Sequence, residues 1–183
     1  MRFQLPYGHH QKVEFDVPDR SLAFYAERKK MPPVADVHHS VIEALKRPMG
    51  TPPLGRIARK GEEVIVLVDD LTRPTPQTEI LPTVLEELCS NGVSPEEIEI
   101  IIGLGTHRPM TDAEVVDHLG PEVAERFTVT NHDCKDDKKL VNLGTTELGI
   151  PALVNKTVVD ADLVISVGNI VPHNAAGWGA EVR

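Results

Sequence analysis

The sequence predicts an α/β fold in which a mainly parallel sheet is flanked by helices in a Rossmann-like arrangement, with a short β-hairpin at the N-terminus. Three observations support this prediction. The run "EEVIVLV" at residues 62–68 is too uniformly apolar for a strand with a solvent face, which is typical of an interior parallel strand. From residue 62 onward, strand, loop and helix patterns alternate. Polar loops also follow three of the expected strands.

The first elements precede this alternating region. The opening "FQLPYGHHQKVEFDVP", residues 3–18, has two alternating runs and predicts the hairpin, with His9 and His10 in its turn. Residues 36–48 predict a helix that Asp36 caps and a proline ends.

The alternating region then predicts the remaining elements in order. Residues 77–92 read as a helix, although Pro82 should kink it or move its start later. The others are a strand at 98–102, a helix at 111–120 that opens with a Thr111 to Glu114 capping box, a further element at 150–161 and a strand at 162–167. We expect each of the three main strands to be buried.

Length and composition limit the classes of function. A chain of 183 residues that is 40% hydrophobic suits a single domain over residues 1–183. The net charge of -9 and the lack of a Lys/Arg-rich block argue against binding nucleic acid or an anionic membrane. No apolar stretch reaches the roughly 20 residues that span a bilayer. The opening residues lack a secretory pattern, so we expect a cytoplasmic protein in which Cys89 and Cys134 are reduced.

Three polar loops leave the carboxyl ends of predicted strands. They are "DDLTRPTP" at 69–76, "GLGTHRPMT" at 103–111 and "GNIVPHNAAGWG" at 168–179. In an open α/β sheet this edge is where ligands bind, because the loops converge there and helix N-termini supply N–H groups. We therefore expect the three loops to share one crevice.

The first two loops carry groups suited to an anion. Arg73 offers a planar fork to a carboxylate or phosphate, Asp70 would orient that arginine or a cofactor hydroxyl, and Thr72 adds a short donor. Thr106 and Arg108 could extend this anion site.

Each of these residues also has a structural interpretation. Asp70 could cap a turn and pair with Arg73, while His107 and His173 could be exposed loop histidines. The joint pattern favours a site, because an apolar strand, a glycine and then a histidine occur twice and place two imidazoles at one edge. Neither H-E-x-x-H nor C-x-x-C is present, so no self-contained metal site is predicted. The glycine-rich stretches also do not match the phosphate-loop or dinucleotide fingerprints.

The three loops, in this order, together with "LPYG" at residues 5–8, resemble the nickel-pincer nucleotide-dependent lactate racemase family and related 2-hydroxyacid racemases and epimerases. The resemblance covers nearly all of this chain but only the amino-terminal domain of that family, whose chains are more than twice as long. It implies that the family's carboxyl-terminal domain is absent from this chain and acts as a missing partner.

The resemblance also implies an isomerase chemistry. In that family, the histidines of the G-T-H-R and P-H loops take and return the hydroxyl proton of a small 2-hydroxy acid. The pyridinium ring of the nickel-pincer cofactor accepts and returns the hydride. By motif, the two catalytic histidines correspond to His107 and His173. An imidazole with an ordinary pKa of about 6.5 can serve as acid or base near neutral pH.

The third loop departs from the family pattern. Relatives carry a lysine ten residues after the P-H histidine, to which the cofactor is covalently attached, and this sequence has Arg183 there. The family's nickel-ligand histidine would lie further on. We therefore expect this chain to lack racemase activity by itself.

Three functional hypotheses follow. The chain is the amino-terminal, substrate- and cofactor-contacting domain of a nickel-pincer racemase or epimerase. Alternatively, it is a non-catalytic anion- or nucleotide-binding module with the same fold. A hydrolase that uses His107 and His173 as an acid/base pair is a third interpretation, but the sequence has no nucleophile elbow or triad spacing to support it.

Overall fold

The computed structural model describes residues 1–7, 11–26, 29, 31–173 and 177–180, and of 172, 173 and 177–180 only the backbone. Within it, the chain divides into two compact units, Met1–Val34 and Ala35–Arg183.

The first unit contains the predicted N-terminal hairpin. Strands β1 (Arg2–Tyr7) and β2 (Gln11–Asp16) pair antiparallel, with Phe3 opposite Phe15. The rings of these two phenylalanines stack with centroids 5.7 Å apart, which is a common stabilising cross-strand pair. The hairpin is thus confirmed, while His9 and His10 lie outside the described residues.

A four-stranded parallel sheet forms the centre of the second unit. Its strand order is β5-β4-β3-β8, built from β3 (Val64–Val68), β4 (Ile98–Ile102), β5 (Thr128–Asn131) and β8 (Leu163–Val167). Strand β3 is buried along its whole length, as its uniformly apolar sequence predicts. Strand β8 lies at one edge of this sheet and alternates between half-buried and exposed residues, so the expectation of a third buried strand is wrong.

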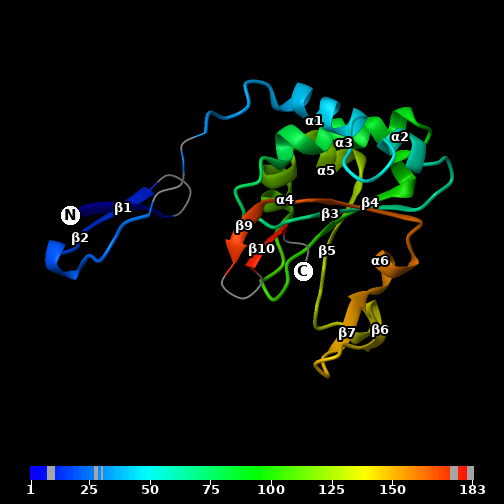
Figure 1. Cartoon of the computed structure of the whole chain (residues 1–183). Helices are drawn as coiled ribbons and strands as arrows, with labels where there is room; N and C mark the ends of the chain where they lie inside the picture. The colour runs from blue at the N-terminus through cyan, green and yellow to red at the C-terminus, as the bar shows by residue number, and fades with distance from the viewer. Residues whose placement is uncertain (8–10, 27–28, 30, 174–176, 181–183) are drawn as a thin grey trace. The chain divides into compact units, whose positions relative to one another are not determined.

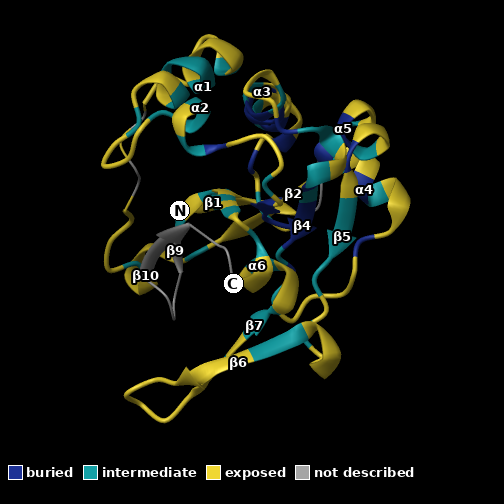
Figure 2. Ribbon diagram, turned by 90° about the vertical axis from the view of Figure 1, so that its right-hand side faces the viewer, coloured by how far each residue is buried: buried dark blue, intermediate teal, exposed yellow. Residues whose placement is uncertain are grey.

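Helices cover one face of this sheet (Figure 1). They are α3 (Gln77–Ser90), α4 (Asp112–Leu119) and α5 (Pro121–Arg126), while α1 (Val37–Lys46) packs on α3 and α2 (Leu54–Ile57) lies nearby. Leu81, Leu85 and Leu88 of α3 pack against the sheet, and Figure 2 shows the buried residues gathered in this layer. Helix α3 begins at Gln77 and continues through Pro82, so the proline does not delay its start.

The other face carries a smaller covering, made of β6 (Leu140–Thr145), β7 (Pro151–Asn155) and α6 (Lys156–Asp160). The sequence region at 150–161, expected to be one element, is thus a strand followed by a short helix. The 3₁₀ turns are Asp19–Ser21, Pro95–Glu97 and Asp137–Lys139. Strands β9 (Ile170–His173) and β10 (Gly177–Ala180) form an antiparallel pair after β8.

The strand order creates a natural crevice. From β3 the chain moves outward to β4 and β5, and then returns to place β8 on the other side of β3. Loops diverge at such a reversal, so the carboxyl ends of β3 and its neighbours are the expected ligand-binding edge. The described residues include no helix long and apolar enough to cross a membrane.

Candidate functional site

Two buried acids follow β3 at the carboxyl edge of the sheet. Asp69 and Asp70 are 2% and 5% exposed. The backbone N–H of Arg73 donates to the carbonyl of Asp70 at 3.0 Å, which closes a tight turn directly after the strand. The backbone N–H of Thr72 donates to Asp70 Oδ1 at 2.9 Å, and the Thr72 hydroxyl donates to the same oxygen. The stretch "DDLTR" is therefore a turn that the Asp70 side chain stabilises.

The second oxygen of Asp70 binds a histidine from the neighbouring loop. His107 Nδ1 lies 2.5 Å from Asp70 Oδ2. Burial acts to raise the pKa of Asp70, but the hydrogen bonds from Thr72 and His107 outweigh it and hold the pKa below its ordinary value. The carboxylate is ionised and can only accept, so Nδ1 carries the proton.

This tautomer leaves His107 Nε2 as the acceptor nitrogen of the neutral imidazole. The His107 side chain is 50% exposed, so a ligand can approach this nitrogen. The arrangement of a buried carboxylate, an oriented imidazole and an accessible Nε2 is that of a general base. The Asp70 carboxylate contacts Thr72 and His107. That it also orients Arg73 or a cofactor hydroxyl stays a prediction.

Asp69 organises the base of the same loop. The Thr75 hydroxyl donates to Asp69 Oδ2, and Gln77 Nε2 donates to Asp69 Oδ1 at 2.7 Å. Gln77 Nε2 also reaches the carbonyl of Val167 at 3.2 Å, and His118 Nε2 donates to the Asp69 carbonyl at 2.9 Å. These bonds connect β3 with α3, α4 and the end of β8.

Sequence reasoning did not identify Asp69, Gln77 or His118 as part of the site. The sequence does offer one signal for Asp69, the two adjacent aspartates in "DDLTRPTP", but the prediction concerns only the second, Asp70. His118 is far away in sequence and has no recognisable ligand spacing.

A small cleft lies where the first two loops meet. Its volume is about 10 Å³, close to the space of one water molecule. The residues that line it are Asp69, Asp70, Arg73, Gly103, Leu104, Gly105 and His107. The structure thus brings together three residues singled out from the sequence, Asp70, Arg73 and His107.

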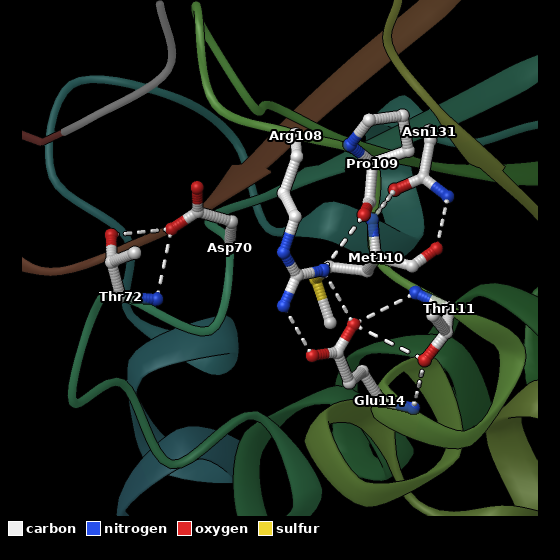
Figure 3. Close-up of polar contacts among 8 residues, drawn as sticks. All are labelled: Asp70, Thr72, Arg108, Pro109, Met110, Thr111, Glu114 and Asn131. Atoms are coloured by element: carbon white, nitrogen blue, oxygen red, sulfur yellow. Dashed lines mark hydrogen bonds and ion pairs between the residues drawn. The ribbon is translucent and has the colours of Figure 1, made fainter. Parts of the chain in front are cut away.

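Arg108 makes a different set of contacts. Its guanidinium donates to both carboxylate oxygens of Glu114, at 2.8 and 2.6 Å, as Figure 3 shows. The hydrogen bond from Arg108, followed by that from the Thr111 backbone, lowers the pKa of Glu114 to about 2. Glu114 and Thr111 also form the predicted capping box of α4. Among the described residues that line the cleft, neither Arg108 nor the exposed Thr106 is found.

The third loop is only partly described. The His173 backbone ends β9, but its side chain lies outside the described residues, as does Arg183. The prediction that His173 shares the crevice with His107 therefore stays a prediction. Within the described residues, no group of three His, Cys, Asp or Glu side chains is placed to hold a metal ion.

Comparisons with known proteins agree on one family. The lactate racemase N-terminal domain family matches residues 7–181. The lactate racemase of Thermoanaerobacterium thermosaccharolyticum is 30% identical over 177 residues, covering 96% of this chain and 41% of the relative. That of Lactiplantibacillus plantarum is 34% identical over 140 residues, covering 76% of this chain and 32% of the relative. The chain therefore spans less than half the length of these relatives.

Solved structures show the same similarity. The lactate racemase apoprotein from Thermoanaerobacterium thermosaccharolyticum superimposes with a TM-score of 0.80 and 29% identity, covering 98% of this chain and 41% of that one. A protein from Thermotoga maritima has a TM-score of 0.58 and 21% identity, covering 78% of this chain and 34% of that one, and shows a similar fold.

Proposed function

This chain belongs to the lactate racemase N-terminal domain family, and we propose that it forms the substrate-contacting domain of a 2-hydroxyacid racemase or epimerase. The observation that supports this most strongly is the hydrogen bond between His107 and the buried Asp70 at the carboxyl edge of the sheet. It gives the site an oriented base in the loop that the family resemblance assigns to catalysis.

The proposed task of His107 is to take the proton from the substrate hydroxyl and return it. Its Nε2 is the accepting nitrogen while Asp70 holds Nδ1–H. As Nε2 takes a proton the ring becomes cationic, and the ionised Asp70 carboxylate stabilises that charge. The pair of Asp70 and His107 thus favours removal of the proton from the substrate hydroxyl.

The proposed task of Arg73 is to bind the substrate carboxylate. It lines the same cleft as His107, and a guanidinium can hold a carboxylate through two parallel hydrogen bonds. A 2-hydroxy acid has its hydroxyl and carboxylate on neighbouring carbon atoms, so one small cleft can address both. Thr72 supports this arrangement through Asp70.

Racemisation also requires a base for the opposite enantiomer, which we assign to His173, and a hydride acceptor. The family's nickel-pincer nucleotide would supply the acceptor. The described residues do not form a site that fits a nickel ion, because no three potential ligands converge among them. We therefore limit the role of this chain to the hydroxyl proton and the carboxylate. We propose that a carboxyl-terminal partner domain supplies further groups, and that the whole protein is cytoplasmic.

The test is an assay of enantiomer conversion. The 183-residue chain is incubated with the cofactor and one pure enantiomer of lactate, and the products are separated by chiral chromatography. A chimera is assayed in parallel, in which residues 7–181 replace the matching part of the Thermoanaerobacterium thermosaccharolyticum lactate racemase. We expect conversion by the chimera only.

His107→Gln in the chimera should lower the rate by about 100-fold or more, because general-base catalysis contributes that much. Arg108→Gln is the matched control, since Arg108 lies next to His107 but is held by Glu114. An unchanged rate for His107→Gln in an active chimera would contradict the proposed role. A folded but inactive chimera, judged by circular dichroism, would favour the non-catalytic module instead.

A further inference from the structure

A second, larger cavity lies on the sheet face opposite to α3, α4 and α5. Its volume is about 310 Å³, and its floor is formed by Leu67 of β3 and Ile101 of β4. Leu153 of β7 and Val158 of α6 form a wall. Among the described residues, a short helix and a two-stranded hairpin cover this face, and they leave this space open.

The cavity also has one oriented polar group. Asn155 Oδ1 accepts from the Thr157 backbone N–H at 2.9 Å, which fixes the orientation of the amide. Asn155 Nδ2 therefore donates to His132 Nδ1 at 3.1 Å. In the neutral imidazole the proton is then on Nε2 of His132, which is one of the residues that line the cavity. Apolar walls with a single placed polar group are typical of small-molecule sites.

Gly103 lines both this cavity and the cleft that contains Asp70 and His107. It follows β4 directly, and its backbone N–H donates to the Val68 carbonyl at 2.8 Å. Since glycine has no side chain, this shared lining residue places no side-chain atoms between the two spaces. One molecule could therefore place its polar groups in the cleft and its apolar part in the cavity.

We propose that the 310 Å³ cavity binds the side chain of the 2-hydroxy acid, and that the substrate has a branched aliphatic or aromatic side chain. This inference rests on the proposed function. A cavity of about 150 Å³ is enough for benzene, so the methyl group of lactate would leave most of this space unfilled. Each additional buried methylene group increases affinity by about fourfold.

The experiment compares ligands by the amide chemical shifts of the isotope-labelled chain. Lactate, 3-phenyllactate and benzyl alcohol are titrated separately; benzyl alcohol has the ring without the hydroxy acid. We expect 3-phenyllactate to bind at least about tenfold more tightly than lactate. It should shift the amides of residues 103–107 together with those of β7 and α6, while lactate shifts only the first group.

Val158→Trp should fill the cavity and abolish the preference for 3-phenyllactate without changing the affinity for lactate. Val159→Trp is the matched control, because Val159 is the next residue of α6, is 39% exposed and does not line the cavity. Leu153→Trp provides a second way to fill the space and should fold readily, since Leu153 is 54% exposed.

Equal affinities for lactate and 3-phenyllactate in the unmodified chain would overturn this inference and leave the proposed function intact. Benzyl alcohol binding as tightly as 3-phenyllactate would also overturn it, because the cavity would then be a separate small-molecule site. If neither hydroxy acid shifts residues 103–107, the proposed function itself is wrong and this inference fails with it.

Discussion

At the scale of single residues, the Asp70 carboxylate has two distinct sides. Oδ1 accepts both the N–H and the hydroxyl of Thr72, and Oδ2 accepts from His107. The acid therefore fixes the turn after β3 and the tautomer of the imidazole at the same time. Its lowered pKa means that folding favours the ionised form, so this contribution to stability is lost as the pH falls through the folded-state pKa.

Asp70→Asn should reverse the tautomer of His107. Because the Thr72 backbone N–H can only donate, the amide oxygen of the asparagine should face Thr72 and its NH₂ should face the imidazole. His107 Nδ1 then accepts and Nε2 carries the proton, which removes the base. The ¹⁵N shifts of the imidazole report this directly. A retained Nδ1–H signal in the variant would contradict the assigned arrangement.

Arg108→Ala should raise the pKa of Glu114 from about 2 toward its ordinary value of 4.5, because the guanidinium is the main cause of the lowered pKa. The carboxyl ¹³C shift of Glu114 followed against pH measures this change. Lactate binding should be unaffected, as Arg108 lies outside the cleft lining. Weaker lactate binding by this variant would instead support the sequence-based prediction that Arg108 extends the anion site.

At the scale of elements, a buried polar network holds the site loop to the helices and the sheet edge. Gln77 begins α3, is 1% exposed, and its Nε2 contacts both Asp69 and the end of β8. Its Oε1 is buried and has no hydrogen-bond partner among the described residues. Gln77 therefore takes part in this network through its Nε2 donor.

Gln77→Ala should lower the free energy of unfolding by about 1–3 kcal/mol, because the buried Asp69 loses a donor. Urea unfolding followed by circular dichroism gives this value. Glu79→Ala is the matched control on the same helix; Glu79 is exposed, so its change should stay within about 0.5 kcal/mol. Equal effects of the two substitutions would show that the network does not stabilise the loop.

The sequence predicted the elements whose own residues determine them. Strand β3 is apolar throughout, β4 is apolar except for Glu99, and α1 and α4 have recognisable caps. Strand β5, with the sequence "TVTN", has no strong pattern and forms because its backbone pairs with β4. The exposure of β8 could also not be read from its residues, since an edge position depends on the strand order.

At the scale of the whole molecule, topology explains why the sequence-predicted residues Asp70 and His107 meet. They are 37 positions apart, yet β3 and β4 are parallel neighbours, so the loops that follow them leave the same edge. Periodicity and loop composition were enough to predict this shared edge. The roles of Asp69, Gln77 and His118 were not predictable, because they depend on contacts between α3, α4 and β8.

The length of the chain relative to its family members also bears on the whole molecule. The chain matches lactate racemases that are more than twice its length, so under the proposed function we expect the described cleft to supply only part of the active site. This agrees with its small volume of about 10 Å³ and with the half-exposed His107. Binding and turnover should therefore be separable: the chain can recognise a 2-hydroxy acid weakly without converting it.

The most direct test of the central claim is a titration of the ¹⁵N-labelled chain with lactate, with propanoate as the control that lacks the 2-hydroxyl group. We predict that lactate shifts the imidazole ¹⁵N signals of His107 and the amides of residues 103–107, and that propanoate perturbs the His107 ring far less. Arg73→Lys should weaken lactate binding despite keeping the charge, because bidentate geometry is lost. Identical responses to lactate and propanoate, or no response of His107 to either acid, would contradict the claim that this cleft recognises 2-hydroxy acids.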